Sequence, residues 1–339
     1  MANIAPSWTQ VHPSFVEPGL LIQYNQKSGA FQTLAGGNPL VKIGAEDKYV
    51  YMKSVKLQTK VTIGQQAANQ LPSASTVFTM ASTPAYLQRL RAEYDHHDTA
   101  AVGRWGTSIV DAQRLAMRQG HFQILRNNLL YGVNGALGEG LLNANGATAV
   151  SLPADSQGDD TVVTYDDGEM AFFILQQILD IKTRTMTLGI PRRFVILGPQ
   201  RVLGLFEYNV VQLTSYIRQG AGSNSTAGTV KDVADWNGDK IEWVYDDTLI
   251  GKGSGGTDAV LIVMPEVEYA SGSLPNTNEF AELEPGILAC TLMYSDVAAP
   301  IEIPTPLAGG AIDVVSEMTA TSGWAPRPEG VTIVSMQYQ

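Results

Sequence analysis

The sequence predicts an α+β protein in which an extended β-hairpin, a long amphipathic helix and a region of mixed helices and strands succeed one another. Three observations support this prediction. Apolar and polar residues alternate over residues 49–63, a helical periodicity runs over residues 107–133, and helical and strand-like segments alternate from residue 166 onward. The length of 339 residues suggests one large domain or two ordinary ones.

The composition is that of a folded protein with few charges. Hydrophobic residues make up 44% of the chain and charged residues 16%, whereas free soluble proteins usually carry about 25% charged residues. The apolar fraction is sufficient for a large core. The low charge leads us to expect that another molecule covers part of the surface.

The net charge of −11 is unevenly distributed. Residues 1–131 carry 12 Lys and Arg against 7 Asp and Glu, whereas residues 132–339 carry 10 against 26. This asymmetry allows the first part of one copy to contact the later part of another, although two solvated faces of a monomer explain it equally well. The sequence has no basic stripe, which argues against tight wrapping around nucleic acid.

Cysteine usage and the N-terminal residues indicate a reducing cytoplasm. Cys290 is the single cysteine and lies in the apolar run GILACTLMY, so it is expected to be a buried thiol without a disulfide partner. The start MANIAPSWTQ has neither the basic region nor the apolar core of a signal peptide. No apolar run approaches the ~20 residues that a membrane span needs, so no membrane partner is expected.

Residues 1–42 are expected to form an extended arm. Prolines and aromatic residues, among them Trp8, Phe15 and Tyr24, are scattered through it without a sustained period. These aromatic residues are too numerous for a disordered tail, and we therefore expect the arm to lie on another surface.

Residues 43–84 are expected to form a long β-hairpin. Its first strand, YVYMKSVKLQTKVTI, has Val55, Leu57, Val61 and Ile63 on one face and polar residues on the other. The turn-rich GQQAANQLPSA and the β-like STVFTMAS come next. A two-stranded ribbon is barely stable alone, so these four apolar residues are predicted to contact a partner surface, which can belong to another chain.

A long helix is expected over residues 107–133. Ser108 and Asp111 resemble a capping pair at its start, and Gly132 is expected near its end. The predicted apolar stripe consists of Leu115, Phe122, Leu125 and Leu129.

The later part of the chain is expected to alternate helix and strand. A second helix should begin at Asp166 with Glu169 three residues on, and a buried strand at Phe194–Leu197 and a short helix should come after it. Asn237-Gly238 predicts the tight turn of a hairpin within WNGDKIEWVYDD. Further strands are expected in TDAVLIVMPEVEY, in GILACTLMYS and at the C-terminus.

The stretch YDHHDTA, residues 94–100, is the strongest candidate for a metal site. His96 and His97 stand between Asp95 and Asp98, and DHH also occurs in a family of two-metal phosphoesterases. That chemistry needs further acids to hold two ions about 3.5–4 Å apart, and the sequence contains no D-x-D pair. A polar turn between the hairpin and the long helix is therefore the favoured interpretation.

Two other stretches imitate binding motifs. GKGSGG at residues 251–256 matches G-x-G-x-x-G, but it precedes a predicted strand instead of a helix, so a hairpin loop is expected. The acidic stretch at residues 155–167 lacks the alternate spacing of a calcium loop and is expected to be a solvated loop and helix cap. We therefore predict no catalytic, cofactor-binding or metal-binding residue, no cofactor and no enzymatic activity.

The order of these parts resembles the major capsid protein of tailed bacteriophages, which has the Hong Kong 97-type fold. GEGLLNANG after the long helix, MAFFILQQILDIK with RRFVILGPQRVLGLF, and WAPRPEGVTIV with its Arg327-Pro328 pair carry the resemblance in detail. It covers nearly the whole chain from about residue 40. It implies an N-arm at 1–42, an E-loop hairpin at 43–84, a P-domain at 85–165 with a spine helix at 107–133, an A-domain at 166–285, and returning strands at 286–339.

The resemblance also implies function and partners. Hexamers and pentamers of the chain would form an icosahedral shell around double-stranded phage DNA, assembled in the host bacterial cytoplasm with scaffolding, portal and decoration proteins as further partners. Val55, Leu57, Val61 and Ile63 would then cover the spine region of a neighbour, while Trp8, Phe15 and Tyr24 would clamp a second one. The arm is short for a cleaved scaffolding segment, so a separate scaffolding protein, or none, is implied.

Three alternatives remain open from the sequence. An encapsulin, a bacterial compartment for enzyme cargo, shares the fold but is usually shorter and lacks so long an arm. A two-metal phosphoesterase would use the cluster at residues 95–98. A tail or adhesion component would form rings or fibres instead of closed shells.

Overall fold

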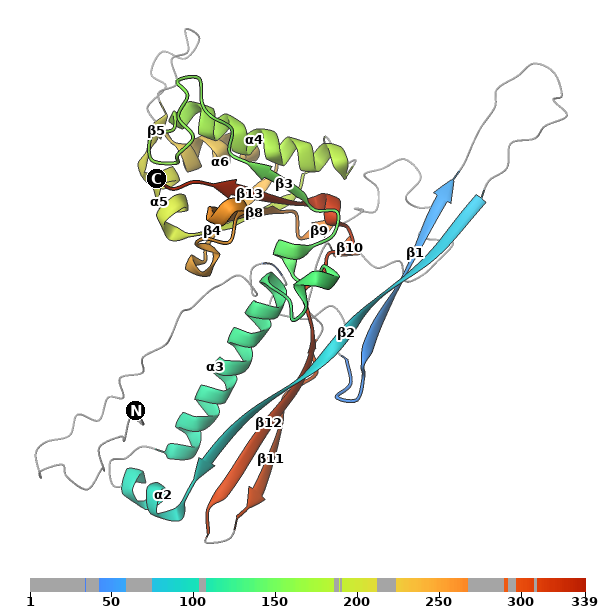
Figure 1. Ribbon diagram of the computed structural model, residues 1–339, viewed down its shortest axis with the longest axis vertical. Helices are drawn as coiled ribbons and strands as arrows, with labels where there is room; N and C mark the ends of the chain where they lie inside the picture. The colour runs from blue at the N-terminus through green and yellow to red at the C-terminus, as the bar shows by residue number, and fades with distance from the viewer. Residues whose placement is uncertain are drawn as a thin grey trace, which may run out of the picture.

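In the computed structural model the chain forms an upper body of helices and strands, an elongated lower body and a β-ribbon that projects from the junction between them (Figure 1). The structure describes residues 34, 43–58, 75–103, 108–185, 189, 191–211, 224–267, 290–291, 297–307 and 310–339. None of the helices in these ranges is long and apolar enough to cross a membrane.

The lower body is built on an antiparallel sheet of four strands, which we call the lower sheet. Its order is β1-β2-β12-β11, with β1 at Tyr49–Gln58, β2 at Ser75–Tyr94, β11 at Ile301–Pro306 and β12 at Ile312–Thr321. The pairing of β1 with β2, from Tyr49 opposite Pro84 to Gln58 opposite Ser75, confirms the predicted hairpin.

Strand β2 changes partner halfway along its length. Residues 75–84 pair with β1, whereas residues 85–94 pair with β12. The strand itself continues without a break at this change of partner. We call β1 and residues 75–84 of β2 the ribbon.

Helix α3, Ile109–Leu130, lies along the lower sheet and comes after the short helix α2, His96–Gly103. The helix is shorter at both ends than the predicted 107–133. Ser108 is the extended N-cap, and its hydroxyl accepts the Asp111 N–H as expected. At the other end Gly132 adopts φ 68°, which is the left-handed conformation that stops helices.

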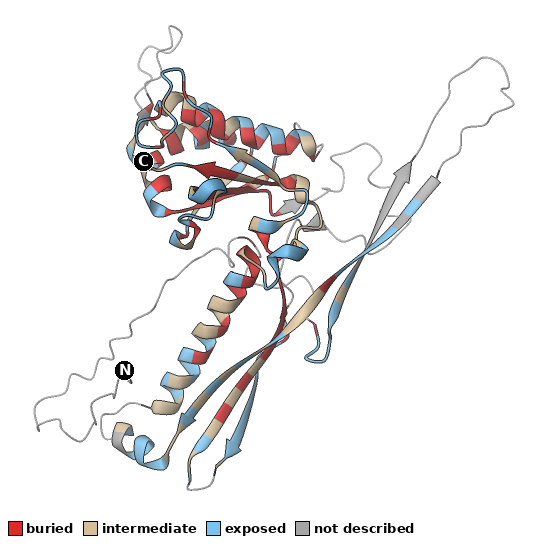
Figure 2. Ribbon diagram, viewed as in Figure 1, coloured by how far each residue is buried: buried red, intermediate tan, exposed pale blue. Residues whose placement is uncertain are grey.

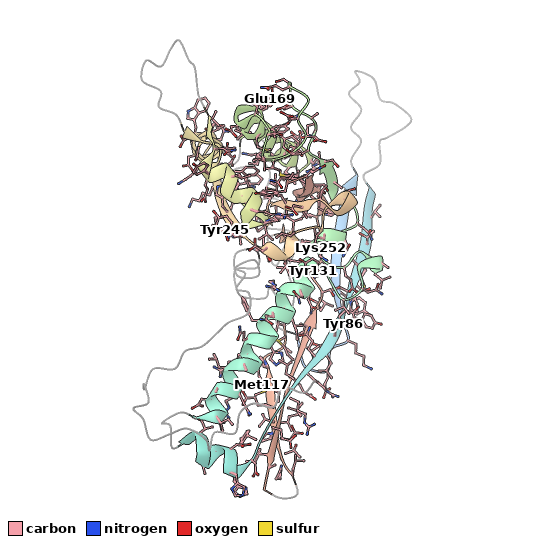
Figure 3. The ribbon with its side chains drawn as sticks, turned by 60° about the vertical axis from the view of Figure 1, so that its left-hand side comes forward. Tyr86, Met117, Tyr131, Glu169, Tyr245 and Lys252 are labelled. Carbon is pink, nitrogen blue, oxygen red and sulfur yellow. The ribbon has the colours of Figure 1, made fainter. Side chains whose placement is uncertain are left out.

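The buried face of α3 differs from the predicted stripe. Leu115 is 38% exposed, whereas Met117, His121, Leu125 and Leu129 are buried at a spacing of four residues. Met117 lies between α3 and the lower sheet (Figure 3), and the His121 ring nitrogen Nε2 lies 2.8 Å from the Ser316 hydroxyl on β12. Leu125 and Leu129 of the predicted stripe are therefore buried as expected, whereas Leu115 was wrongly included. Apolarity alone missed His121 because its side chain is polar.

The upper body contains a mixed sheet of order β3-β13-β8-β4-β7, which we call the upper sheet. Its strands are Thr148–Ser151, Val331–Met336, Asp258–Val263, Arg193–Gly198 and Lys240–Tyr245 in that order. The pairs β4–β7 and β13–β3 are parallel, and the other two pairs are antiparallel. This sheet and the antiparallel lower sheet together match the predicted α+β class.

Both faces of the upper sheet are covered, which explains why β8 is apolar from Ala259 to Val263. Helices α4, α5 and α6 cover one face, where their apolar residues pack in one cluster with Ile196 of β4 and Ile262 of β8. The end of α3 covers the other face, with Leu129 packed in the same cluster as Leu197 and Leu261. The three covering helices are Asp167–Arg184, Gln200–Tyr208 and Thr226–Trp236. Figure 2 shows the resulting concentration of buried residues.

The prediction of a hairpin at Asn237-Gly238 was wrong. Asn237 is the C-cap of α6, Gly238 has φ 77°, and the next strand, β7, pairs in parallel with β4. Asn-Gly is typical both of hairpin turns and of helix ends because both need positive φ. By contrast, Asp166 caps α4 as predicted and accepts the N–H groups of Gly168 and Glu169.

The remaining elements are short. Within the described ranges, the 3-10 helices are Gly135–Leu137, Leu141–Asn143, Asp247–Leu249, Ser254–Gly256 and Pro328–Gly330, and the two-residue strands are Val210–Val211, Asn224–Ser225, Glu266–Val267 and Cys290–Thr291. GKGSGG forms a loop with a single 3-10 turn that leads directly into β8. The loop is confirmed, but the prediction that it closes a hairpin was wrong, because β4 lies between β7 and β8 in the upper sheet. The motif leads into a strand, whereas a dinucleotide site requires it to lead into a helix.

Candidate assembly interface

The ribbon presents an exposed apolar face. Tyr49, Tyr51 and Met80 are 56%, 62% and 63% exposed. The register sets Tyr49 opposite Pro84 and Met80 opposite Lys53, and residues that are opposite or two apart on a strand share one face. All three side chains therefore lie on the same side, where the rings of Tyr49 and Tyr51 are 6.3 Å apart. This much exposed apolar surface on a two-stranded ribbon is typical of a contact with another molecule.

The structure does not test our predicted contact residues. The backbone positions of Val55 and Leu57 lie opposite Phe78 and Thr76, in the register of that same face, but their side chains lie outside the described part. Val61 and Ile63 of the hairpin, and Trp8, Phe15 and Tyr24 of the arm, also lie outside the described residues. These seven contacts stay predictions.

We did not predict Tyr49, Tyr51 or Met80 from the sequence. The signal was present, because Tyr49 and Tyr51 continue the alternation of Val55 and Leu57 toward the start of the strand. Lys53 interrupts the apolar positions of this face and concealed the continuation.

The root of the ribbon is fixed by a buried carboxylate. Glu139 accepts hydrogen bonds from the Tyr86 hydroxyl at 2.8 Å, the Ser322 hydroxyl at 2.8 Å and the Asn134 N–H at 2.9 Å. Burial, and then the hydrogen bond to Glu139, raise the pKa of Tyr86 to about 12. The phenol therefore keeps its proton at neutral pH and continues to donate to Glu139.

Close backbone contacts complete this junction between the two bodies. The Gly323 N–H donates to the Asn128 carbonyl at 2.7 Å, and the Gly140 N–H donates to the Gly323 carbonyl at 2.7 Å. Nearby, the Tyr131 hydroxyl donates to the Thr248 carbonyl at 2.8 Å, and Lys252 lies 5.7 Å from the centre of the Tyr131 ring (Figure 3). Hydrogen bonds thus connect the strand β2, the end of α3 and the residues after β12 at this junction.

Ion pairs line the lower sheet. Arg89 pairs with Glu317 at 2.7 Å, and Arg91 pairs with Asp313 at 2.9 Å across the strand pair β2–β12. Both arginines are exposed, so each pair contributes only about 0–1 kcal/mol. Their main effect is on register, because a slip of one residue would separate the charges.

A cavity of about 220 Å³ lies between α3 and the lower sheet. Its lining residues are Tyr94, Val110, Gln113, Arg114, Met117, Glu302, Pro304 and Val314. The Glu302 carboxylate pairs with Arg114 at 3.1 Å, so the one acid among these lining residues is already neutralised.

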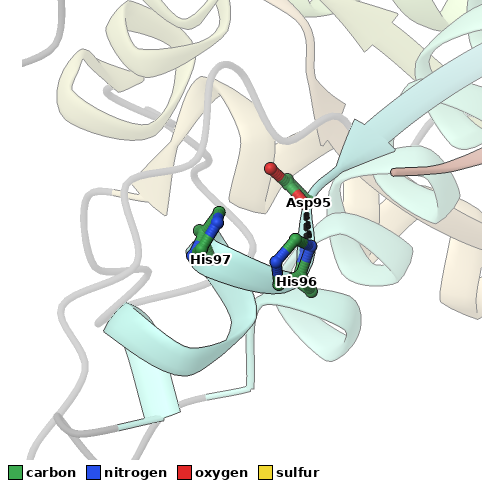
Figure 4. A group of neighbouring side chains, drawn as sticks. All are labelled: Asp95, His96 and His97. Carbon is green, nitrogen blue, oxygen red and sulfur yellow. Dashed lines mark hydrogen bonds and ion pairs between the residues drawn. The ribbon is translucent and has the colours of Figure 1, made fainter. Parts of the chain in front are cut away.

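The sequence YDHHDTA does not form the turn that we predicted. Asp95 joins β2 to α2, which begins at His96, and the Asp95 carbonyl accepts the Thr99 N–H at 3.0 Å. Asp95, His96 and His97 gather one ligand atom each within 4.8 Å of one another (Figure 4). Asp98 is outside this group, and among the described residues no second group of three such ligands exists. The described part of the chain therefore does not assemble the two-ion site of a phosphoesterase.

In the acidic stretch at residues 155–167, the Asp155 carboxylate accepts hydrogen bonds from backbone N–H groups. One carboxylate oxygen of Asp155 accepts the N–H groups of Gln157 and Asp159 at 2.9 and 2.8 Å, and the other accepts that of Asp166 at 3.2 Å. The predicted loop and helix cap are confirmed, with Asp155 buried at the centre of the loop instead of solvated.

Comparisons with known proteins show that the fold of this chain is similar to that of solved structures. No protein-family model matches the chain, and no curated protein matches it. Among solved structures, the capsid of Myoviridae phage XM1 has 11% identity and a TM-score of 0.61, with 99% of this chain and 100% of that chain covered. The capsid of a native GTA particle has 12% identity and a TM-score of 0.55, with 99% of both chains covered. The mature capsid of bacteriophage PhiM1 has 10% identity and a TM-score of 0.54, with 97% of this chain and 93% of that chain covered. The chain therefore has the Hong Kong 97-type fold of phage major capsid proteins, as its sequence predicted.

Proposed function

We propose that this protein is the major capsid protein of a tailed phage, and that many copies assemble through hexamers and pentamers into an icosahedral shell around double-stranded DNA. The observation that carries the proposal is the match to capsid subunits over nearly the full length of both chains. The contribution of the chain is geometric: it supplies complementary surfaces and no chemical step.

The ribbon supports this proposal because it cannot bury its own apolar face. Tyr49, Tyr51 and Met80 project from a two-stranded element whose root is fixed at Glu139. A second copy that covers this face would gain about 25 cal/mol for each Å² of apolar surface removed from water. We propose that Val55, Leu57, Val61 and Ile63 extend the same contact over the spine region of a neighbour. Trp8, Phe15 and Tyr24 would hold another neighbour.

The remaining parts of the proposal concern the division of the chain into domains, its partner proteins and the place where it assembles. We keep the N-arm at 1–42, the E-loop at 43–84, the P-domain at 85–165, the A-domain at 166–285 and the returning strands at 286–339. Scaffolding, portal and decoration proteins are proposed partners, with assembly in the host bacterial cytoplasm. With 26 acidic residues after residue 131, contacts with DNA would be sparse and screened by salt.

Substitutions on the ribbon test the proposed contact. We expect Tyr51→Thr and Met80→Thr each to raise the subunit concentration needed for assembly by about tenfold or more, because each removes roughly 1.5–3 kcal/mol of apolar burial from every contact. Threonine keeps the strand propensity. Sedimentation velocity over a concentration series measures the effect.

The matched control is Val77→Thr. Val77 is 42% exposed and pairs with Lys56, so it lies on the opposite face of the same ribbon. It should assemble like the unmodified protein. Equal assembly of all three variants would show that the apolar face of the ribbon is not a contact between subunits.

A further inference from the structure

The cluster Asp95, His96 and His97 has a geometry that the sequence alone does not reveal. Consecutive residues usually point in different directions, yet the two imidazole rings lie 3.9 Å apart with 40° between their planes. Oδ1 of Asp95 is 2.5 Å from Nδ1 of His96. One donor atom from each residue falls within 4.8 Å of the others (Figure 4). Three ligand atoms thus converge at the corner where β2 passes into α2.

Local hydrogen bonds hold Asp95 in place. Its Oδ1 accepts the His96 N–H at 2.5 Å, and its carbonyl accepts the Thr99 N–H at 3.0 Å and the Thr99 hydroxyl at 3.1 Å. Its own N–H donates to Oδ2 of Asp98 at 3.4 Å. The carboxylate is therefore oriented before any ligand arrives, and Asp98 has a supporting position instead of a ligating one.

We propose that Asp95, His96 and His97 bind one divalent first-row transition metal ion, such as Zn²⁺, Ni²⁺ or Co²⁺. Two imidazole nitrogens and one carboxylate oxygen form a donor set that suits these ions, whereas Mg²⁺ and Ca²⁺ prefer oxygen ligands. Bonds of about 2.0–2.2 Å to a tetrahedral ion place donor atoms roughly 3.4 Å apart. The side chains of Asp95 and His96 are exposed, so small rotations bring the three donors from their present separations to that value.

The site binds a single ion with three protein ligands, and the remaining coordination position is open to water. His96 also lies against the connection between β11 and β12, where a Cβ on Gly310 would approach its Nδ1 to 3.2 Å. Gly310 has φ 87°, a conformation that excludes most side chains. The metal would therefore brace the corner between β2 and α2 beside this connection. The inference does not depend on the proposed capsid function.

Equilibrium dialysis of the full-length protein against Zn²⁺ or Ni²⁺, with elemental analysis of the dialysed sample, tests the site. We expect one ion per chain, unaffected by millimolar Mg²⁺. Asp95→Asn should weaken binding about tenfold or more, since even the loss of an outer-shell partner costs 10–100-fold. His96→Ala and His97→Ala should each weaken binding further. These residues lie at the surface, and circular dichroism verifies that each variant is folded.

Two matched controls locate the ion. Asp98→Asn changes the other aspartate of the same stretch and keeps an oxygen that accepts the Asp95 N–H, so binding should persist. His12→Ala removes a histidine elsewhere in the sequence and should also leave binding unchanged. The proposal is overturned if the protein binds no ion at micromolar concentration, if the double variant His96→Ala/His97→Ala retains the full stoichiometry, or if Asp98→Asn weakens binding as much as Asp95→Asn.

Discussion

Replacing Asp239 by alanine is expected to lower the free energy of unfolding of the subunit by about 3–5 kcal/mol. The Asp239 carboxylate lies just after α6 and accepts two hydrogen bonds from the Lys182 ammonium of α4, at 2.8 and 2.7 Å, and one from the Arg192 N–H at 2.8 Å. Both side chains of the ion pair are buried, at 5% and 3% exposure. The substitution leaves a buried ammonium group without its counter-ion. Urea unfolding of the unassembled subunit, monitored by circular dichroism, measures the loss.

An exposed ion pair nearby supplies the matched control. Glu242 on β7 pairs with Arg193 on β4 at 2.9 Å, and both side chains are partly in water. Glu242→Ala should therefore cost no more than about 1 kcal/mol. Adding Lys182→Met to Asp239→Ala should recover part of the stability, because an apolar side chain then replaces the stranded charge. If Asp239→Ala and Glu242→Ala lowered the free energy of unfolding equally, the claim that burial makes the Lys182–Asp239 pair more costly to break would be contradicted.

Replacing Gly323 by alanine is expected to destabilise the junction between the two bodies by at least about 3 kcal/mol, which combines overpacking with lost backbone hydrogen bonds. A Cβ at this position would lie 2.4 Å from the carbonyl oxygen and 2.6 Å from the Cα of Leu129. Both are backbone atoms of α3 and cannot rotate away. The connection after β12 must then move off the helix, which breaks the hydrogen bonds of Gly323 with Asn128 and Gly140.

Gly204 is the matched glycine for this test. It lies within α5, and a Cβ there would meet no described atom within 4 Å. Gly204→Ala should stabilise the protein by about 0.4–1 kcal/mol, because alanine loses less backbone entropy in a helix. Denaturant unfolding should therefore show a lower free energy of unfolding for Gly323→Ala and a higher one for Gly204→Ala than for the unmodified protein. A Gly323→Ala protein as stable as the unmodified one would mean that α3 and the connection are not in close contact.

The elements that the sequence predicts well are those set by short-range patterns. Ser108 and Asp166 mark helix starts because a capping side chain and the N–H groups that it accepts lie within three residues. The hairpin is predicted by the period of two in its strands, which the pairing of β1 with β2 confirms. Asn237-Gly238 failed because one dipeptide fits two structures, and only the pairing of β7 with β4 decides between them.

The junction could not be predicted because its parts are distant in the sequence. Tyr86, Glu139 and Ser322 meet through the fold, and although Glu139 lies in the stretch GEGLLNANG, nothing in that stretch indicates its two hydroxyl partners. His121 shows the same limit, since its place in the buried face of α3 depends on Ser316 across the sheet. Burial lowers the pKa of His121, because the folded state favours the neutral imidazole over the charged one. By contrast, the sequence shows that Asp95, His96 and His97 are residues of metal-binding types. It does not show that their ligand atoms lie close together, which only the structure reveals.

Electron microscopy of the full-length protein produced alone, with particle mass measured on the same sample, tests the proposed function most directly. The proposal predicts closed shells tens of nanometres wide, or hexamers and pentamers that close into them when a scaffolding protein is added. A later reconstruction should place Tyr51 and Met80 of one copy against a second copy. Open rings or fibres, or a monomer that forms neither capsomers nor shells under either condition, would contradict the proposal.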